Sequence, residues 1–460
     1  MKKVMIFALP NSFSPSAKNS SYDKRISPLG LATLGAVLMR ENSVRLIDGL
    51  AAGMTLEKAA GIIEGYSPDV LLLSVFDRCR WALEPAGELI KNIKRPMIGL
   101  IGTHDPQVNA DIMKGFEGID FSTYGDPEYT ALQILKQGSS DGVDGAVCRK
   151  AGGIHINKPR PLIENLDELP LPDRFLFDAK IYERFPHENK TANPIDVQCA
   201  RGCPFGCSFC SVMLIDSRVY RARSPESVCA EIEGLVKKYS SREINFLDSV
   251  MTLDRKWFLR LCALMEPLKV EWSCQTRADL VDEELLKRMK AAGCFSILFG
   301  IETLDEGTLS SINKGVKYES VKTALDMTKK IGIEARVSCM LGLPQETPAS
   351  AMRMVNRVVK MKPDFAQFHC TVAFPGTQLY EKALDWGRLE APSSRKFDLT
   401  GYPFVPAGYR DSGEVRLIQR RAYMRFYLRP GFVFNIMKNP SAIKRYARGA
   451  GIFLRILSEK

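Results

Sequence analysis

Four of the twelve cysteines lie within one short stretch of the chain, at positions 199, 203, 207 and 210. The last three are spaced C-x3-C-x2-C with glycine and proline between them, which is typical of a tight loop. A structural zinc site usually takes four protein ligands, whereas three thiolates can hold a [4Fe-4S] cluster and leave one iron open. We therefore expect Cys203, Cys207 and Cys210 to bind metal, with a zinc knuckle as the alternative. Cys199 belongs to an expected strand at 195–199, so we do not expect it to be a ligand.

The segment 200–210 reads Ala-Arg-Gly-Cys-Pro-Phe-Gly-Cys-Ser-Phe-Cys and resembles the cysteine motif of the cobalamin-binding branch of radical S-adenosylmethionine (SAM) enzymes. An aromatic residue before the last cysteine, here Phe209, is part of that resemblance. It implies that the three cysteines bind a [4Fe-4S] cluster and that SAM binds the open iron. It also implies a low-potential electron donor such as flavodoxin or ferredoxin.

Helical and strand patterns alternate after this loop. Helices are expected at 225–238, 255–265, 283–292, 321–331 and 349–361, and strands at 244–247, 270–275, 295–299, 334–341 and 367–372. Such units predict a parallel sheet, here a partial (β/α) barrel of the TIM type, with chemistry at the carboxyl ends of its strands. The resemblance implies SAM contacts by Phe209, Asp248, Gln275, Arg277, Glu302 and Arg336. Two alternatives stay open: Glu302 as a helix N-terminal acid, and Arg277 as the partner of Asp279 or Asp282.

The N-terminal third shows a second alternation. Strands are expected at 4–9, 44–47, 70–75, 97–101 and 119–121, and helices at 31–41, 56–65, 82–91, 106–114 and 128–135. This predicts a doubly wound, Rossmann-like sheet that binds ligands at the carboxyl ends of its strands. No G-x-G-x-x-G is present, which argues against a dinucleotide.

Short phrases in this region resemble the cobalamin-binding domain that precedes many radical SAM barrels. They imply cobalamin contacts by Leu29, Gly30, Asp48, Ser74, Gly102, Thr103, His104, Gly125 and Glu128. None of the four histidines lies in a D-x-H-x-x-G motif, so the lower axial ligand of cobalamin is undefined. A Rossmann-like domain without a ligand is the alternative.

The net charge of +11 is concentrated at one end of the chain. Residues 415–460 contain eleven basic side chains and one acid, interleaved with aromatic residues. The charge distribution therefore does not indicate a positive potential over the whole molecule that would bind nucleic acid. The tail fits either a packed cap with a solvated basic face or helices in peripheral contact with an anionic membrane.

Composition and pattern set the broad class and the domain order. With 45% apolar and 25% charged residues the chain is globular, and no apolar run reaches the roughly 18 residues of a membrane span. The apolar run 4–9 stops at Pro10, which favours a buried strand over a signal peptide. We expect a cytoplasmic protein, with membrane-surface association left open. The expected domains are 1–145, cobalamin-binding-like; 146–190, a proline-rich linker; 191–385, the radical SAM barrel; and 386–460, a basic helical region.

The resemblance implies an enzyme that reductively cleaves SAM to a 5′-deoxyadenosyl radical and methylates an unactivated carbon of a small-molecule substrate. A cyclase or rearranging enzyme that uses cobalamin without methyl transfer stays open. So do a non-catalytic corrinoid- or cluster-binding sensor and a tRNA-modifying enzyme. The basic aromatic tail favours a lipid or tetrapyrrole substrate. No catalytic side chain is assigned.

Overall fold

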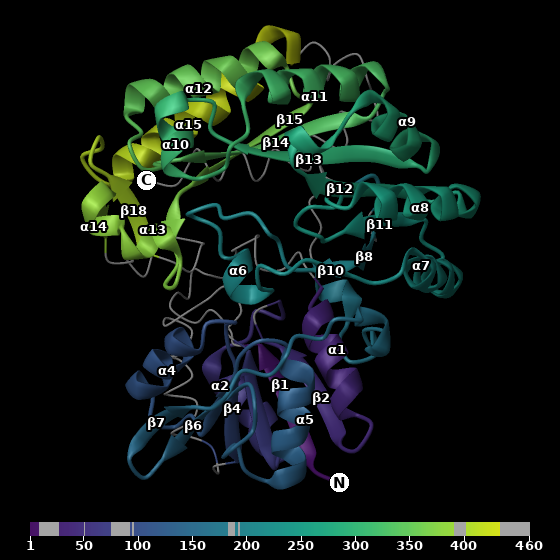
Figure 1. The fold of residues 1–460 in the computed structure, drawn as a ribbon, viewed down its shortest axis with the longest axis vertical. Coiled ribbons are helices and arrows are strands. Elements are labelled where there is room, and N and C mark those ends of the chain that lie inside the picture. Colours follow the sequence, from purple (N-terminus) through teal and green to yellow (C-terminus); the bar gives the residue numbers. More distant parts are fainter. Residues whose placement is uncertain are drawn as a thin grey trace.

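The computed structural model describes residues 1–8, 27–49, 51–74, 93, 96–182, 189–191, 194–390 and 402–432. Figure 1 shows an N-terminal unit in the lower half of the view and a second, larger unit above it. Each unit is built on its own sheet, mostly parallel in the first unit and wholly parallel in the second. The predicted α/β fold is therefore confirmed. The expected helix at 82–91 lies outside the described residues.

Within the described residues the first sheet has the strand order β2-β1-β3-β4-β5-β6-β7. Its strands are β1 (Lys3–Ala8), β2 (Ser43–Asp48), β3 (Val70–Ser74), β4 (Met97–Ile101), β5 (Phe121–Thr123), β6 (Ala146–Lys150) and β7 (Gly153–Ile156). Its helices are α1 (Leu29–Leu38), α2 (Leu56–Tyr66), α4 (Pro106–Gly115) and α5 (Pro127–Gln137). Strands β1 to β5 are parallel, and β6 and β7 are antiparallel to their neighbours.

The apolar strands of this sheet bury side chains on both faces. In β1, Val4 and Ile6 pack in a cluster with residues of α1 and α5, whereas Met5 and Phe7 pack in a cluster with residues of α2 and α4. Because successive side chains of a strand point to opposite faces, an uninterrupted apolar strand needs helices on both sides. The sheet is thus doubly wound, as expected.

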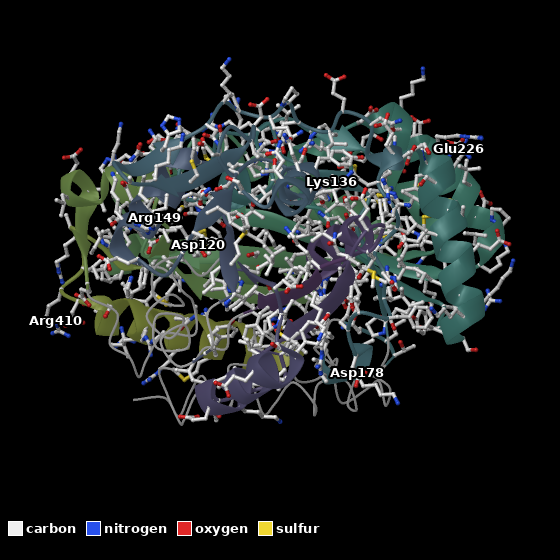
Figure 2. All side chains as sticks on the ribbon, turned by 90° about the horizontal axis from the view of Figure 1, so that it is seen from below. Asp120, Lys136, Arg149, Asp178, Glu226 and Arg410 are labelled. Carbon is white, nitrogen blue, oxygen red and sulfur yellow. The ribbon has the colours of Figure 1, made fainter. Side chains whose placement is uncertain are left out.

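The hairpin of β6 and β7 extends this sheet into the segment expected to be a linker (146–190). The two strands are joined by Ala151 and Gly152. Arg149 ties β6 to the start of β5: its backbone N–H donates to the Asp120 carbonyl at 3.1 Å, and its side chain donates to the Ile119 carbonyl. Figure 2, which views the molecule from below, shows Asp120 and Arg149 close together. The domain boundary at 145 remains a prediction.

The second sheet has the strand order β15-β14-β13-β12-β11-β8, all parallel. Its strands are β8 (Ile195–Val197), β11 (Glu243–Phe246), β12 (Glu271–Thr276), β13 (Cys294–Glu302), β14 (Glu334–Leu341) and β15 (Phe365–Cys370). The helices between them are α7 (Pro225–Tyr239), α8 (Arg255–Met265), α9 (Glu283–Ala291), α10 (Glu306–Ser311), α11 (Tyr318–Lys330) and α12 (Pro348–Met361). Apart from the short α10, these helices line the outside of the unit (Figure 1). Neighbouring strands follow one another in the chain, which is the order of a partial (β/α) barrel.

Shorter elements complete the structure. Between β8 and α7 lie β9 (Ala200–Arg201), α6 (Val212–Ile215) and β10 (Arg221–Ala222), and β9 pairs with β10. Short 3-10 helices lie at Leu166–Glu168, Ala179–Ile181, Glu266–Leu268 and Ala278–Leu280. Beyond the barrel are β16 (Val372–Ala373), α13 (Gln378–Glu381), α14 (Ala383–Trp386), β17 (Gly387–Leu389), β18 (Tyr402–Pro406) and α15 (Ser412–Tyr427).

The region expected to be helical from 386 onward begins with strands, because β18 pairs with both β16 and β17. Helix α15 then packs on the barrel: Gln419 donates to the Phe368 carbonyl, and the Tyr427 hydroxyl donates to the Ala366 carbonyl. This part of the basic tail is therefore a packed cap. Residues 433–460, the rest of that tail, lie outside the described residues. Within the described residues we find no helix long and apolar enough to cross a membrane.

Candidate active site

The cysteine loop at 203–210 lies between the two units and is held at several points. Its start is fixed where the Cys203 N–H donates to the Ser217 carbonyl at 3.2 Å. Further along, the Ser208 N–H donates to the Ile312 carbonyl at 3.0 Å, and the Leu379 N–H donates to the Ser208 carbonyl at 2.8 Å. The loop therefore rests on segments that follow β13 and β15, at the carboxyl end of the barrel.

Two thiols of this loop, those of Cys207 and Cys210, have raised pKa values. Burial raises the pKa of Cys207, and it raises the pKa of Cys210 to about 12. The other cysteines of the loop raise both pKa values further, whereas the nearby Lys314 ammonium lowers them. The Cys203 sulfur therefore lies within electrostatic range of the other two. Thiols of this kind need a bound metal to stay deprotonated at neutral pH.

Soft thiolate donors on one loop fit an iron–sulfur cluster. Across the described part of the chain, no three His, Cys, Asp or Glu side chains are arranged around one point as ligands of a single metal ion. In a four-iron cluster each cysteine binds a different iron, so the ligands need not meet at one point. The residues present fit the cluster that the sequence predicts.

Cys199 has a different environment. It is 1% exposed and lies two residues after the end of β8, and burial raises the pKa of its thiol well above the usual value. Its backbone N–H donates to the Asp248 carboxylate at 3.0 Å. These features agree with the expectation that Cys199 is a structural side chain.

A pair of opposite charges borders the loop. Glu302 ends β13, and its carboxylate accepts a hydrogen bond from the Lys314 ammonium at 2.8 Å, with both side chains at most one-tenth exposed. The backbone of Glu302 has φ +56°, an uncommon conformation for a residue with a side chain. Lys314 is a site residue that the sequence analysis missed, because it lies in no motif and follows a short helix.

Arg277 connects this pair to the cysteine loop. Its guanidinium lies 3.8 Å from the centre of the Phe205 ring, a cation–π contact, and donates to the Lys314 carbonyl at 2.9 Å. It also binds the Asp279 carboxylate at 2.7 Å, the pairing that the sequence left open. The structure thus brings Arg277 and Glu302 together beside the loop.

The other residues expected to contact SAM are arranged differently. Gln275 and Arg336 share one row across the sheet, because both are in register with Leu298 of β13. The alternate residues of these strands, such as Cys274 and Val337, belong to the apolar core. Gln275 and Arg336 therefore lie on the opposite, inner face of the sheet.

Asp248 and Phe209 make contacts within the protein that stabilise the fold. The Asp248 carboxylate accepts hydrogen bonds from the backbone N–H groups of Cys199 and Ala200, and burial raises its pKa to about 6. Phe209 packs against a small apolar cluster that includes Leu379 and Phe404. Their assignment to SAM remains a prediction.

Most residues expected to contact cobalamin lie at the carboxyl edge of the first sheet. Asp48 ends β2, and its carboxylate accepts hydrogen bonds from the Tyr182 hydroxyl at 3.1 Å and the Ala51 N–H at 2.9 Å. Ser74 ends β3 and is buried. The Thr103 N–H donates to the Asn109 side chain at 2.9 Å.

The glycines and Leu29 at this edge have separate roles. A Cβ on Gly102 would lie 2.3 Å from an Asn109 oxygen, so only glycine leaves room for the Asn109 side chain here. Gly125 has φ +73°, which favours glycine. Gly30 is exposed with open space around it, and the buried Leu29 lines a pocket between α1 and residues 198–201. There is therefore open space beside the start of α1, at this edge of the sheet.

His104 and Glu128 instead reach the second unit. The His104 N–H donates to the Leu214 carbonyl of α6 at 2.6 Å, and burial lowers the pKa of its imidazole to about 4. Glu128 is 1% exposed and binds Arg201 of β9 at 2.6 Å. The structure does not place a free Glu128 carboxylate at the edge of the sheet.

The structure thus has two α/β units with a three-cysteine loop between them, an architecture suited to an enzyme that binds an iron–sulfur cluster. Residues 197–358 match the family model of the radical SAM superfamily. "Uncharacterized methyltransferase PH0819" from Pyrococcus horikoshii is 30% identical over 416 residues, 88% of each chain. The chain belongs to the radical SAM superfamily, and it is a radical SAM enzyme. It is also 25% identical over 419 residues to an anaerobic magnesium-protoporphyrin IX monomethyl ester cyclase from Rubrivivax gelatinosus, covering 88% of this chain and 74% of the relative.

Solved structures share the fold. The radical SAM methyltransferase TsrM from Kitasatospora setae, with cobalamin and a [4Fe-4S] cluster bound, superposes with a TM-score of 0.70 at 16% identity, covering 94% of this chain and 89% of that chain. The cobalamin-dependent SAM radical enzyme OxsB, with aqua-cobalamin and SAM bound, gives a TM-score of 0.71 at 16% identity over 97% of this chain and 70% of that chain. The arrangement of both units is therefore common to these enzymes and this chain.

Proposed function

We propose that this protein is a cobalamin-dependent radical SAM methyltransferase. The observation that carries the proposal is the position of the three-cysteine loop, between the carboxyl edge of the Rossmann-like sheet and the carboxyl end of the barrel. A relative at 30% identity is named a methyltransferase, and the similar fold of TsrM holds both a cluster and cobalamin. When bound, the cluster and SAM supply radical chemistry and cobalamin supplies a methyl group.

The chain's own residues have defined tasks in this proposal. Cys203, Cys207 and Cys210 hold the cluster. Glu302 and Arg277 offer opposite charges to the zwitterionic amino-acid part of SAM, and Gln275 and Arg336 line the inner face of the barrel. The carboxyl edge of the first sheet, near Gly30 and Ser74, holds cobalamin. The two units exclude water from the space between them.

The substrate class follows from the relatives as a proposal. Relatives of this chain are named for magnesium-protoporphyrin IX monomethyl ester, bacteriochlorophyllide d and hopanoid substrates. These substrates are large and mostly apolar. We propose a hydrophobic polycyclic substrate, such as a tetrapyrrole or a polycyclic lipid.

A cobalamin-dependent cyclase is the second candidate, because a cyclase from Rubrivivax gelatinosus matches 88% of this chain. SAM labelled in its methyl group distinguishes the two. Both candidates form 5′-deoxyadenosine, but a methyltransferase transfers the labelled methyl group to the product, whereas a cyclase leaves the product unlabelled.

Anaerobic reconstitution tests the proposal. We expect about four irons per chain, one cobalamin, and 5′-deoxyadenosine on addition of SAM and a reductant. Cys207→Ala should abolish iron binding and SAM cleavage. The matched control, Cys199→Ala, removes a nearby buried thiol and should keep the wild-type iron content. Zinc in place of iron, or equal iron in both variants, would contradict the proposal.

A further inference from the structure

Four buried charged side chains link the two units. Asp126 and Glu128 come from the carboxyl edge of the first sheet and the start of α5, and Arg201 and Arg221 come from β9 and β10 of the second unit. Arg201 binds Glu128 at 2.6 Å and Asp126 at 3.1 Å, and Arg221 binds the other oxygen of Asp126. We call this group the charge seam. Its side chains are between 1% and 14% exposed.

The charge seam is closed by backbone contacts. The Ile163 N–H donates to Asp126 at 2.8 Å, and Arg221 donates to the Ile163 carbonyl at 2.8 Å. Two carboxylates therefore face two guanidiniums with their hydrogen bonds largely satisfied. Removing one partner from such a set leaves a buried charge uncompensated, which is strongly destabilising.

The charge seam holds the hairpin that carries the cysteine loop. Arg201 is two residues before Cys203, and Arg221 pairs directly with Arg201 across the hairpin. The chain between these two strands contains all three cysteines and α6. On α6 the Leu214 carbonyl accepts a third link, from the His104 N–H. The base of the loop is thus fixed to the first unit, whereas Ser208 near its tip is fixed to the barrel.

We infer that Arg201 and Arg221 are positioning residues that set the cysteine loop against the first sheet, with Asp126 and Glu128 as their anchors. This inference rests on the proposed function, because it assigns the charge seam the task of keeping the cluster at a fixed distance from the group bound by the first sheet. It also gives Glu128 a role other than the cobalamin contact expected from the sequence.

Hydrogen–deuterium exchange of the protein without cofactors tests the link itself. Glu128→Gln removes one anchor in the first unit, yet we expect the segment 203–214 of the second unit to exchange at least about tenfold faster. The matched control is Glu231→Gln. Glu231 is also a buried glutamate between two arginines, Arg174 and Arg223, but it makes no contact with the first sheet in the described residues. The control should leave 203–214 unchanged. Faster exchange confined to residues near 128 would overturn the inference.

Reconstituted protein tests the positioning role. We expect Glu128→Gln to keep the wild-type iron content but to need at least about fivefold more SAM for the change in the electron paramagnetic resonance spectrum of the reduced cluster. Glu231→Gln should titrate like the wild type. Wild-type affinity for SAM in Glu128→Gln would overturn the inference. If the wild-type protein takes up no cluster, the proposed function fails, while the exchange experiment still reports on the charge seam.

A second variant covers the case in which Glu128→Gln does not fold. Arg201→Lys keeps the charge, but a single ammonium cannot bind Glu128 and Asp126 in the forked geometry of a guanidinium. We expect an intermediate increase in the exchange of 203–214. Exchange identical to the wild type would count against a positioning role for Arg201.

Discussion

The Lys314 side chain affects both the stability of the fold and the electrostatics of the cysteine loop. Its ammonium pairs with Glu302 at 2.8 Å and lowers the pKa of the Cys207 thiol, although burial outweighs this effect. Both members of the pair are buried, so neither can be replaced alone without leaving a charge in an apolar setting. The same cation therefore stabilises the end of β13 and lies near a thiol of the cysteine loop.

We predict that Lys314→Met lowers the free energy of unfolding by about 3–5 kcal/mol, because Glu302 loses its partner. Urea unfolding at neutral pH measures the change. The double variant Lys314→Met/Glu302→Gln should recover part of the loss. As a control, Lys322→Met removes an exposed pair with Asp326 and should cost less than about 1 kcal/mol. Equal costs for the two lysines would contradict the prediction.

Glu346 gives the protein a pH dependence. It is 1% exposed, and its carboxylate accepts hydrogen bonds from the Gly342 N–H and the Tyr409 hydroxyl, each at 2.6 Å. Burial raises its pKa from 4.5 to about 7. The folded state then binds the proton more tightly than the unfolded state, so this group stabilises the fold below pH 4.5 and loses that contribution as the pH rises to 7.

Glu346→Gln removes this titration and keeps an oxygen for both donors. We predict that the variant gains stability relative to the wild type between pH 4.5 and pH 8, by up to about 3 kcal/mol. Chemical denaturation across this pH range provides the measurement. Glu306→Gln, at an exposed position of α10, should give a constant difference. A flat difference for Glu346→Gln as well would show that Glu346 does not titrate in this window.

At the scale of the element, the β9–β10 hairpin depends on Gly202. Its φ is +84°, and a Cβ there would lie 2.0 Å from the Val219 carbonyl oxygen. We predict that Gly202→Ala destabilises the hairpin by at least about 2 kcal/mol and prevents normal iron uptake. Gly206 lies in the same loop, where the nearest atom to a Cβ would be an Arg218 nitrogen at 3.7 Å. Gly206→Ala should therefore bind iron like the wild type, and similar losses in both variants would contradict this account.

The barrel elements could be predicted from the sequence because each carries its own periodic pattern. The helix at 255–265 and the strand at 334–341 were expected with the bounds that the structure has. The β6–β7 hairpin was not expected, because β7 is short and mostly exposed and its pattern is weak. The short strands β17 and β18 were not expected for a similar reason: β18 pairs with β17 and β16, and neither strand joins the large sheets.

Individual contacts of the site were harder to predict than the elements. The sequence proposes Cys203, Cys207 and Cys210 as ligands, because their spacing indicates a metal loop and the wider motif resembles that of radical SAM enzymes. No such pattern indicates the charge seam, because Glu128 lies 73 residues from Arg201 and Asp126 lies 95 residues from Arg221. A resemblance assigned Glu128 to cobalamin, whereas the packing of the two units pairs it with arginine. Contacts between the units depend on how the units pack, and a local sequence pattern does not predict that packing.

At the scale of the whole molecule, the hairpin that carries the cysteine loop is bound to the carboxyl edge of the first sheet, and the loop itself rests on the carboxyl end of the barrel; Figure 1 shows α6, which belongs to this hairpin, between the two units. Parallel sheets bind ligands at these edges, so the architecture brings two ligand-binding edges to one place. Such an arrangement works only if the units keep a fixed relation. Links between them include the charge seam, the His104–Leu214 hydrogen bond, and a hydrogen bond from the Ser27 N–H to the buried Asp196 of β8.

The charge seam should therefore make the two units unfold together. We predict that the wild type melts in one calorimetric transition and that Arg221→Gln melts in two, with the first unit and the barrel separating. The stability lost should be about 3 kcal/mol or more, because Asp126 stays buried with one partner fewer. Arg255→Gln breaks an exposed ion pair with Asp282 within the barrel and should keep one transition with a loss below about 1 kcal/mol. A single transition in Arg221→Gln, lowered no more than in Arg255→Gln, would mean that surface complementarity other than the charge seam joins the units.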